Sequence, residues 1–555
     1  MRAYCLMLAF SQWLPVGAAE SALPVGMRWR APPASASAGW APAVIREAPT
    51  NETCLLSRTD GTLEIYAIGK PASDVVTVMR SHDGGLTWSE AQTAFVLPGK
   101  AYYAIQVLAA TDGALHAVMH ILGEGPGGYR GRLYEVYHAT LVSGASAWSS
   151  PRRIVPGYVG SIRGFIQLRQ SGRLVLAVAR AVPEREKAPA SGPDLGWNDT
   201  FVYISDDAGR SWQESPDRLS LDLKTTNVTR YGAIEPVLLE LRDQRVWMLV
   251  RDRGGRLWQS WSDDRAAHWP ALARSAFISS DSPAALLRLK NGKIVLFTNR
   301  CQNGSDPRSY AMGGREVLHA AISADDGETW RGFREVLHEP LGASRGDRGT
   351  AYASAAENAI GKVVFVSGQG EGKRAIVTFD PAWLEESVVR DELAAGPSGW
   401  THYGAPGLRV ETFGSGPRAV AMPLPAAGLG GALWNFPLGA AGEVSFRIQV
   451  PAEARSVRLA LNDHFNRIDD VAAAERAVFA LTVDQLADAG WHDVHLTWRD
   501  ATANGAWQVA IDGQPPRELP AQRPAQFGVN YLRIEFRATS AQGWVRLSEL
   551  VARVP

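Results

Sequence analysis

The sequence predicts an all-β protein in which a six-bladed β-propeller is followed by a β-sandwich. Two observations carry this prediction: an octapeptide and a hairpin pattern, both of which recur along the first two thirds of the 555 residues. The composition agrees, because 54 Gly and 19 Trp suit many short strands joined by tight turns and packed by aromatic side chains.

The octapeptide occurs in three intact copies that each end in Trp: SHDGGLTW at Ser81–Trp88, SDDAGRSW at Ser205–Trp212 and SADDGETW at Ser323–Trp330. A degenerate copy ends at Trp269, and Trp148 fits an eroded one, which gives a period of about 60 residues. The Asp carboxylate can accept backbone N–H groups, Gly can adopt positive φ, and Trp can pack between sheets. We therefore interpret the octapeptide as a turn that fastens a strand end, and we expect the chemistry elsewhere.

Each period also contains two runs of alternating polar and apolar residues around a turn that usually holds Gly. Alternation with a period of two predicts strands, and DG or NG between two such runs predicts a hairpin. Six hairpins predict six blades around an axis. The six segments are CLLSRTDGTLEIYAIG, IQVLAATDGALHAVMHI, FIQLRQSGRLVLAVA, PVLLELRDQRVWMLVR, PAALLRLKNGKIVLFTN and ASAAENAIGKVVFVSG.

The inner strands of a propeller line its central funnel, so equivalent hairpin positions should meet there. About eight residues before each turn stand Glu52, Ala104, Arg163, Glu235, Pro283 and Tyr352. About eight residues after it stand Ile68, His120, Ala179, Arg251, Asn299 and Gly368, with Arg180 and Arg300 one residue away. Carboxylates, cations, a His and a Tyr around one axis indicate a site for an anionic ligand.

The octapeptide resembles the Asp-box of the sialidase superfamily, and the resemblance covers roughly residues 27–395. GAIEPVLLELRDQRVWMLVR resembles the block that carries the catalytic Glu and a carboxylate-binding Arg, which implies Glu235 and Arg251. GTAYASAAENAIGKVVFVSG is similar to the block of the nucleophilic Tyr, which implies Tyr352. Two further segments, GGREVLHAAISADDGETW and ASDVVTVMRSHDGG, imply Arg315 as a second carboxylate-binding Arg and Asp74 as the catalytic Asp.

The resemblance implies a secreted glycoside hydrolase that acts on terminal sialic acid or a related anionic sugar with retention. Tyr352 is then the nucleophile, Glu235 takes its proton, and Asp74 protonates the leaving oxygen and later activates water. The sequence departs from the family at one point: the stretch APTNETCLL lacks the first Arg of the carboxylate-binding triad. Arg163 or Arg58 can supply the missing charge, and Glu52 at this position can instead meet a sugar hydroxyl or a cation.

Two other functions stay open. The first is a polysaccharide lyase that acts on uronic acids, with His120 or Tyr352 as base and acid and Arg251 neutralising the uronate carboxylate. The second is a glycan-binding propeller without catalysis. His116 and His120 share a strand face but show no third ligand, so we expect no metal and no other cofactor.

The sequence predicts a signal peptide and two domains joined by a linker. Residues 1–19 resemble a secretory signal peptide, which predicts a secreted or periplasmic protein, and we expect the propeller over residues 27–393. A linker over residues 394–399 then leads to a sandwich over residues 400–555, where WHDVHLTW and AWQVAIDGQ alternate in the manner of strands. The pattern resembles concanavalin-like or laminin-G-like domains, which often bind carbohydrate and equally often only pack on the domain beside them.

Charge and cysteine usage exclude several classes of partner. Lys plus Arg and Asp plus Glu are equal at 57 each, so the protein has no net charge that would favour binding to nucleic acid or to an anionic membrane. No later run approaches the roughly 20 apolar residues of a membrane span. Beyond the predicted signal peptide only Cys54 and Cys301 remain, which excludes a disulfide framework and leaves one possible bridge open.

Overall fold

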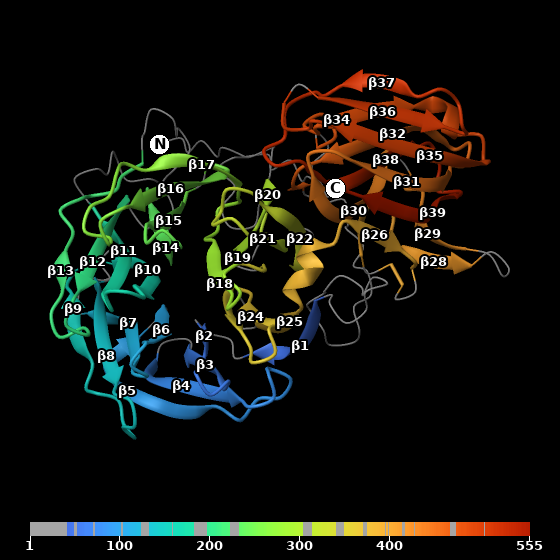
Figure 1. Cartoon of the computed structure of the whole chain (residues 1–555). Helices are drawn as coiled ribbons and strands as arrows, with labels where there is room; N and C mark the ends of the chain where they lie inside the picture. The colour runs from blue at the N-terminus through green and yellow to red at the C-terminus, as the bar shows by residue number, and fades with distance from the viewer. Residues whose placement is uncertain are drawn as a thin grey trace, which may run out of the picture.

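The protein is described by a computed structural model in which almost all regular structure is β-strand (Figure 1). The model describes residues 42–48, 53–69, 73–101, 104–123, 133–157, 159–182, 197–221, 232–252, 254–302, 314–339, 349–369, 374–393, 396–397, 399–412, 417–426, 428–466, 473–503 and 505–555. Within these ranges the regular helical segments are the short 3-10 turns η3 (Pro381–Glu385) and η4 (Asp484–Leu486). The predicted signal peptide and Glu52 lie outside the described residues.

Six antiparallel sheets of four strands form the blades. The first three blades comprise β2 (Thr53–Ser57), β3 (Leu63–Ile68), β4 (Ser73–Ser81) and β5 (Gln92–Ala101); β6 (Ile105–Ala109), β7 (Leu115–Gly123), β8 (Leu133–Leu141) and β9 (Arg152–Val155); and β10 (Val159–Gln167), β11 (Leu174–Ala181), β12 (Asn198–Ser205) and β13 (Gln213–Glu214). The fourth and fifth comprise β14 (Ile234–Glu240), β15 (Val246–Arg251), β16 (Arg256–Ser262) and β17 (Ala273–Ile278); and β18 (Ala285–Arg288), β19 (Ile294–Thr298), β21 (Val317–Ser323) and β22 (Arg331–His338). The sixth comprises β23 (Ser354–Glu357), β24 (Val363–Ser367), β25 (Arg374–Phe379) and β1 (Ala43–Ala48).

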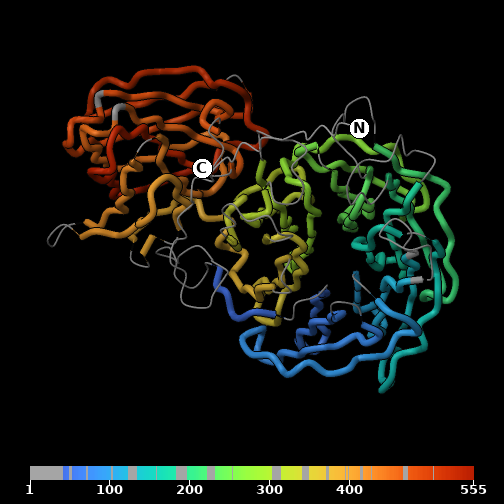
Figure 2. The backbone as a smooth tube through the Cα atoms, turned by 180° about the vertical axis from the view of Figure 1, so that it is seen from behind, coloured from blue at the N-terminus to red at the C-terminus, as the bar shows by residue number. Residues whose placement is uncertain are grey.

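The blades close into a ring. The inner strands β2, β6, β10, β14, β18 and β23 each contact the next, and β23 contacts β2 again. The N-terminal strand β1 pairs with β25, so the sixth blade joins the first part of the chain to the last part of the propeller. The view from behind shows the same circle of blades from β1 round to β25 (Figure 2). The predicted six-bladed propeller is therefore confirmed.

The octapeptide is the turn that its sequence predicted. Asp83 Oδ1 accepts the N–H groups of Leu86 and Thr87 at 3.1 and 2.9 Å, and Trp88 Nε1 donates to the Gly85 carbonyl at 3.0 Å. In the third intact copy, the Trp330 ring lies 5.5 Å from Phe277 of the preceding blade, centroid to centroid. The motif thus closes its own turn with the carboxylate and joins two blades with the indole.

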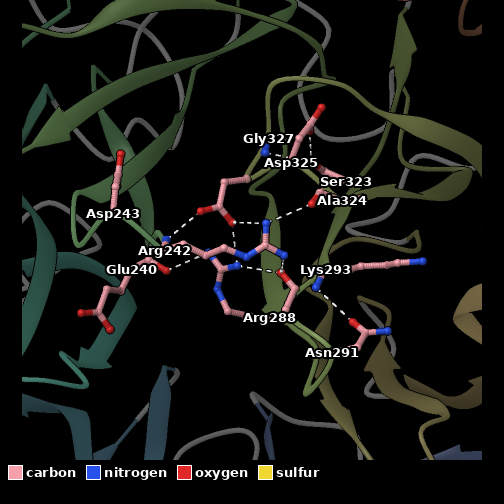
Figure 3. A network of polar contacts seen from close by, with 12 residues as sticks. Glu240, Arg242, Asp243, Arg288, Asn291, Lys293, Ser323, Ala324, Asp325 and Gly327 are labelled. Atoms are coloured by element: carbon pink, nitrogen blue, oxygen red, sulfur yellow. Dashed lines mark hydrogen bonds and ion pairs between the residues drawn. The ribbon is translucent and has the colours of Figure 1, made fainter.

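Arginines at the same end of the propeller connect the fourth blade to the fifth (Figure 3). Arg242 donates to the carbonyls of Ala324 and Gly292 at 3.0 and 2.9 Å. Arg288 donates to the Glu240 carbonyl at 3.0 Å in the opposite direction. These bonds join the turns of the two blades, and the carbonyl of the buried residue Glu240 obtains a donor from Arg288.

Two sheets form the C-terminal sandwich. The larger sheet has the order β28 (Arg409–Thr412), β29 (Arg418–Pro423), β39 (Trp544–Arg553), β31 (Gly442–Gln449), β35 (Trp491–Arg499), β36 (Ala506–Ile511) and β37 (Arg517–Pro520), and β26 (Val388–Asp391) also pairs with β39. The smaller has the order β27 (Trp400–Tyr403), β30 (Gly428–Gly439), β38 (Val529–Ala538), β32 (Ala454–Asn462) and β34 (Phe479–Val483). The alternating residues of β35 and β36 enter the core between the sheets, as their pattern predicted.

The sandwich contacts the fifth blade through a polar and aromatic interface. The two-residue strands β20 (Cys301–Gln302) and β33 (Phe465–Asn466) pair in parallel across it. The Tyr531 hydroxyl donates to Glu335 Oε1 at 2.7 Å and lies 2.6 Å from His319 Nε2. Both Cys54 and Cys301 are buried free thiols, so the bridge left open by the sequence does not form.

Candidate active site

The backbone of the inner strands departs from regular extended geometry at the positions that the hairpin alignment selected. Ala104, Glu235 and Tyr352 have φ values of 68°, 51° and 70°, and all three are non-glycine residues in the left-handed region. In the fourth blade the strand register shifts between Ile234 and Val237. Such conformations cost roughly 1–3 kcal/mol each and concentrate at functional sites. A bulge of this kind also re-aims a side chain, here at the mouth of the funnel.

Arg251 joins the predicted base to the predicted nucleophile. Its Nη1 lies 2.5 Å from Glu235 Oε2 and 3.3 Å from the Tyr352 hydroxyl. The Arg251 side chain is 3 % exposed and that of Glu235 is 13 % exposed, so this contact is shielded from water. The Arg251 guanidinium thus links the predicted base and the predicted nucleophile through one nitrogen.

Asp281 is a member of the site that sequence reasoning missed. Its Oδ1 accepts from Arg251 Nε at 2.8 Å and lies 2.7 Å from Arg251 Nη2. Its main-chain carbonyl accepts from Arg315 Nε at 3.0 Å and from Arg315 Nη2 at 2.5 Å. One residue therefore holds both arginines that the resemblance assigned to a substrate carboxylate.

Arg163 reaches Tyr352 from the third blade. Its guanidinium carbon lies 4.3 Å from the centroid of the Tyr352 ring, and that of Arg315 lies 5.2 Å from it. Burial raises the pKa of the Cys54 thiol in the first blade, and the charge of Arg163 acts in the opposite direction.

The remaining predicted residues do not join this group. Asp74 is exposed at the start of β4, and none of the described contacts of the site involves it. The start of β4 lies at the same end of the first blade as the start of β2, because β4 runs parallel to β2 with β3 between them. Asp74 is therefore exposed at the same end of the propeller as the start of the inner strands.

Two predicted funnel residues are elsewhere. His120 is fully buried, with its ring 5.8 Å from that of Tyr134 on the neighbouring strand, so it is not accessible to a substrate. Arg300 is 1 % exposed and stacks on Phe333 at 4.3 Å and on Phe527 of the sandwich at 5.9 Å, so it belongs to the interface between the domains. Side chains alternate between the faces of a strand, so an alignment that is uncertain by one residue can assign the wrong face. Across the described ranges, no three His, Cys, Asp or Glu side chains gather in a way that could hold a metal ion.

The family follows from a comparison with protein-family models. The model of the BNR repeat-like domain matches residues 72–364, more than half of the 555 residues. The chain belongs to the BNR repeat-like family.

Three solved structures are similar to this BNR repeat-like chain. A protein of unknown function from Dyadobacter fermentans is 14 % identical, covers 61 % of this chain and 96 % of its own, and has a TM-score of 0.44. The sialidase of Trypanosoma rangeli is 13 % identical over 91 % of this chain and 92 % of its own, with a TM-score of 0.41. The NanB sialidase of Streptococcus pneumoniae is 12 % identical over 62 % of this chain and 71 % of its own, with a TM-score of 0.42. Among curated proteins, none matches the chain. In the part of the chain that the structure describes, no helix has the length and apolarity to cross a membrane.

Proposed function

We propose that the protein is a secreted, exo-acting glycoside hydrolase that removes terminal sialic acid or a related anionic sugar with retention of configuration. The observation that supports this most is the contact of one Arg251 nitrogen with both Glu235 and the Tyr352 hydroxyl. Sialic acid carries a carboxylate on its anomeric carbon, which repels a carboxylate nucleophile. A neutral Tyr avoids that repulsion, and sialidases are an exception to the two-carboxylate mechanism of glycosidases.

In the first step the Tyr352 oxygen attacks the anomeric carbon, a bond forms between them, and the glycosidic C–O bond breaks. Glu235 accepts the phenol proton, and Asp74 donates a proton to the leaving oxygen. In the second step water attacks the anomeric carbon, Asp74 takes its proton, and Tyr352 leaves and regains a proton from Glu235. This role requires Asp74, which is exposed in the structure, to turn toward the bound sugar.

The charge around Tyr352 suits an anionic sugar. Four guanidinium groups contact the members of the site, against the two carboxylates of Glu235 and Asp281. These are Arg163 over the Tyr352 ring, Arg251, Arg315, and Arg374, whose Nη1 donates to the Tyr352 carbonyl at 3.2 Å. Cations in excess of carboxylates give the site a positive potential, which attracts a ligand of the opposite sign.

The test is release of free sialic acid from a mixture of sialoglycans, with Tyr352→Phe and Glu235→Gln compared with the unaltered protein. Loss of the nucleophile is expected to lower kcat/KM by a factor on the order of 10³ or more. Tyr66→Phe is the matched control, because the Tyr66 hydroxyl donates to Glu64 within the first blade at 2.9 Å, outside the funnel. Activity of Tyr352→Phe above about a tenth of the parent value would overturn the proposal. So would an unsaturated uronate product in place of free sugar acid.

A further inference from the structure

Asp281 already occupies the two arginines that a substrate carboxylate would need. Arg251 uses its Nε and Nη2 on the Asp281 carboxylate and its Nη1 on Glu235 and Tyr352. Arg315 uses its Nε and Nη2 on the Asp281 carbonyl and its Nη1 on Gln369 Oε1. Every nitrogen of both guanidinium groups therefore donates to an acceptor of the protein itself.

Burial makes this arrangement hard to open. The side chains of Arg251 and Asp281 are 3 % and 8 % exposed, and Arg315 is fully buried. A substrate carboxylate that bound to these arginines would have to displace shielded, charge-assisted hydrogen bonds, which are stronger than neutral ones. Without a ligand, the guanidinium groups of Arg251 and Arg315 are thus already hydrogen-bonded and not available to a substrate carboxylate.

The turn that carries Asp281 is itself fixed. The Ser280 N–H donates to the Asn299 carbonyl at 2.9 Å, and the hydroxyls of Ser280 and Ser282 lie 3.1 Å apart. The Ser279 hydroxyl donates to the Ser280 carbonyl at 3.1 Å. Hydrogen bonds on both sides of Asp281 hold its carboxylate and its carbonyl in place, as a supporting shell does for a functional group.

We propose that Asp281 is a specificity-determining residue whose carboxylate stands in for a substrate carboxylate at Arg251 and Arg315, and that Arg163 makes the direct contact with the sugar carboxylate. This inference rests on the proposed function only in taking a sugar acid as the ligand of the funnel. Arg163 is half-buried, and its guanidinium lies over the ring of Tyr352 at 4.3 Å from the centroid. One guanidinium holds a carboxylate less tightly than three, so the native protein binds sugar acids weakly and discriminates less against sugars without a carboxylate.

The experiment is a calorimetric titration with 2-deoxy-2,3-didehydro-N-acetylneuraminic acid, a sugar acid without a glycosidic bond, whose ring is flattened at the C2–C3 double bond. Asp281→Asn removes the internal charge and keeps the size, and it is expected to bind this ligand at least tenfold more tightly than the parent. Asp281→Glu keeps the charge and is expected to stay within threefold of the parent. Arg163→Gln is expected to bind at least fivefold more weakly, because it removes the direct contact.

The opposite result has a clear meaning. If Asp281→Asn binds equally or more weakly while its thermal unfolding shows a folded protein, Asp281 orients the arginines for the ligand and the proposal is wrong. If Asp281→Asn does not fold, the same titration is carried out with Asp281→Ser and Arg163→Gln. Unchanged binding of the ligand by Arg163→Gln would overturn the proposal. Absence of binding to every variant overturns it as well.

The titration also separates this inference from the proposed function, because binding needs no turnover. A tenfold gain in Asp281→Asn without any hydrolysis by the parent upholds the inference and refutes the hydrolase. Hydrolysis by the parent that depends on Tyr352, without tighter binding of the ligand by Asp281→Asn, supports the hydrolase and refutes the inference.

Discussion

Replacing Arg300 with Met is expected to raise the free energy of unfolding, although it removes a charged side chain from the interior. The guanidinium is 1 % exposed, and its Nε, Nη1 and Nη2 have no hydrogen-bond partner among the described residues. It lies near two aromatic rings that stack on each other, 4.3 Å from the centroid of Phe333 and 5.9 Å from that of Phe527. A buried charge without hydrogen bonds is among the more costly features that a protein can carry.

The magnitude follows from the pKa and the ring contacts. Burial lowers the pKa of Arg300 from 12.5 to about 10, even though Asp463 attracts the charge. A change of this size destabilises the charged form by roughly 3 kcal/mol at neutral pH. Stacking on the rings returns about 1–2 kcal/mol. Met is unbranched and apolar and can keep most of the ring contacts, so Arg300→Met should stabilise the protein by about 1–2 kcal/mol.

The assay is urea unfolding, with the midpoint and the slope measured for both proteins. An increase in the midpoint with an unchanged slope would report a change in stability alone. Arg315→Met is the contrasting variant, because it leaves the Asp281 carbonyl and Gln369 without their partner and should cost about 3–5 kcal/mol. A loss of 1 kcal/mol or more in Arg300→Met would refute the reasoning, since the contacts of the guanidinium would then outweigh its desolvation.

Two further predictions concern the propeller. Asp325→Ala removes the acceptor of the Thr329 N–H, the Thr329 hydroxyl and the Ser323 hydroxyl, at 2.9, 2.5 and 2.8 Å. In the urea assay it should lower the free energy of unfolding by about 2 kcal/mol. The control Glu328→Ala, in the same exposed turn, should change the free energy of unfolding by less than about 0.5 kcal/mol. Burial, with the charges of His116 and Arg152, lowers the pKa of His138 from 6.5 to about 3. Between these two pH values the imidazole is therefore protonated in the unfolded chain and neutral in the folded protein. The stability that this supplies is complete above pH 6.5 and declines as the pH falls toward 3. His138→Asn should therefore lose less Tm between pH 7 and pH 4 than the parent, and equal losses in the two proteins would contradict the assignment.

The fold could be predicted from the sequence because its signals are local. The period of two in each hairpin and the carboxylate, Gly and Trp of each octapeptide act within a few residues, and the structure keeps them as predicted. The pairing of β1 with β25 and of β20 with β33 joins residues far apart in the chain, and no short pattern announces either pair. The strand β26 shows the same limit, since it precedes the predicted linker and yet pairs with β39 of the sandwich.

The residues of the site also differ in whether a local sequence pattern predicts them. Glu235 and Arg251 of the fourth blade meet Tyr352 of the sixth because the inner strands of the blades converge on one axis. Asp281 escaped prediction because it lies before its hairpin, in a serine-rich turn without a motif, and reaches the arginines only after the ring of blades has closed. The repeats therefore determine where the cations lie, but the acceptor that each cation serves depends on single loop residues. For this reason a propeller can keep the catalytic blocks of a family while changing the ligand that its arginines recognise.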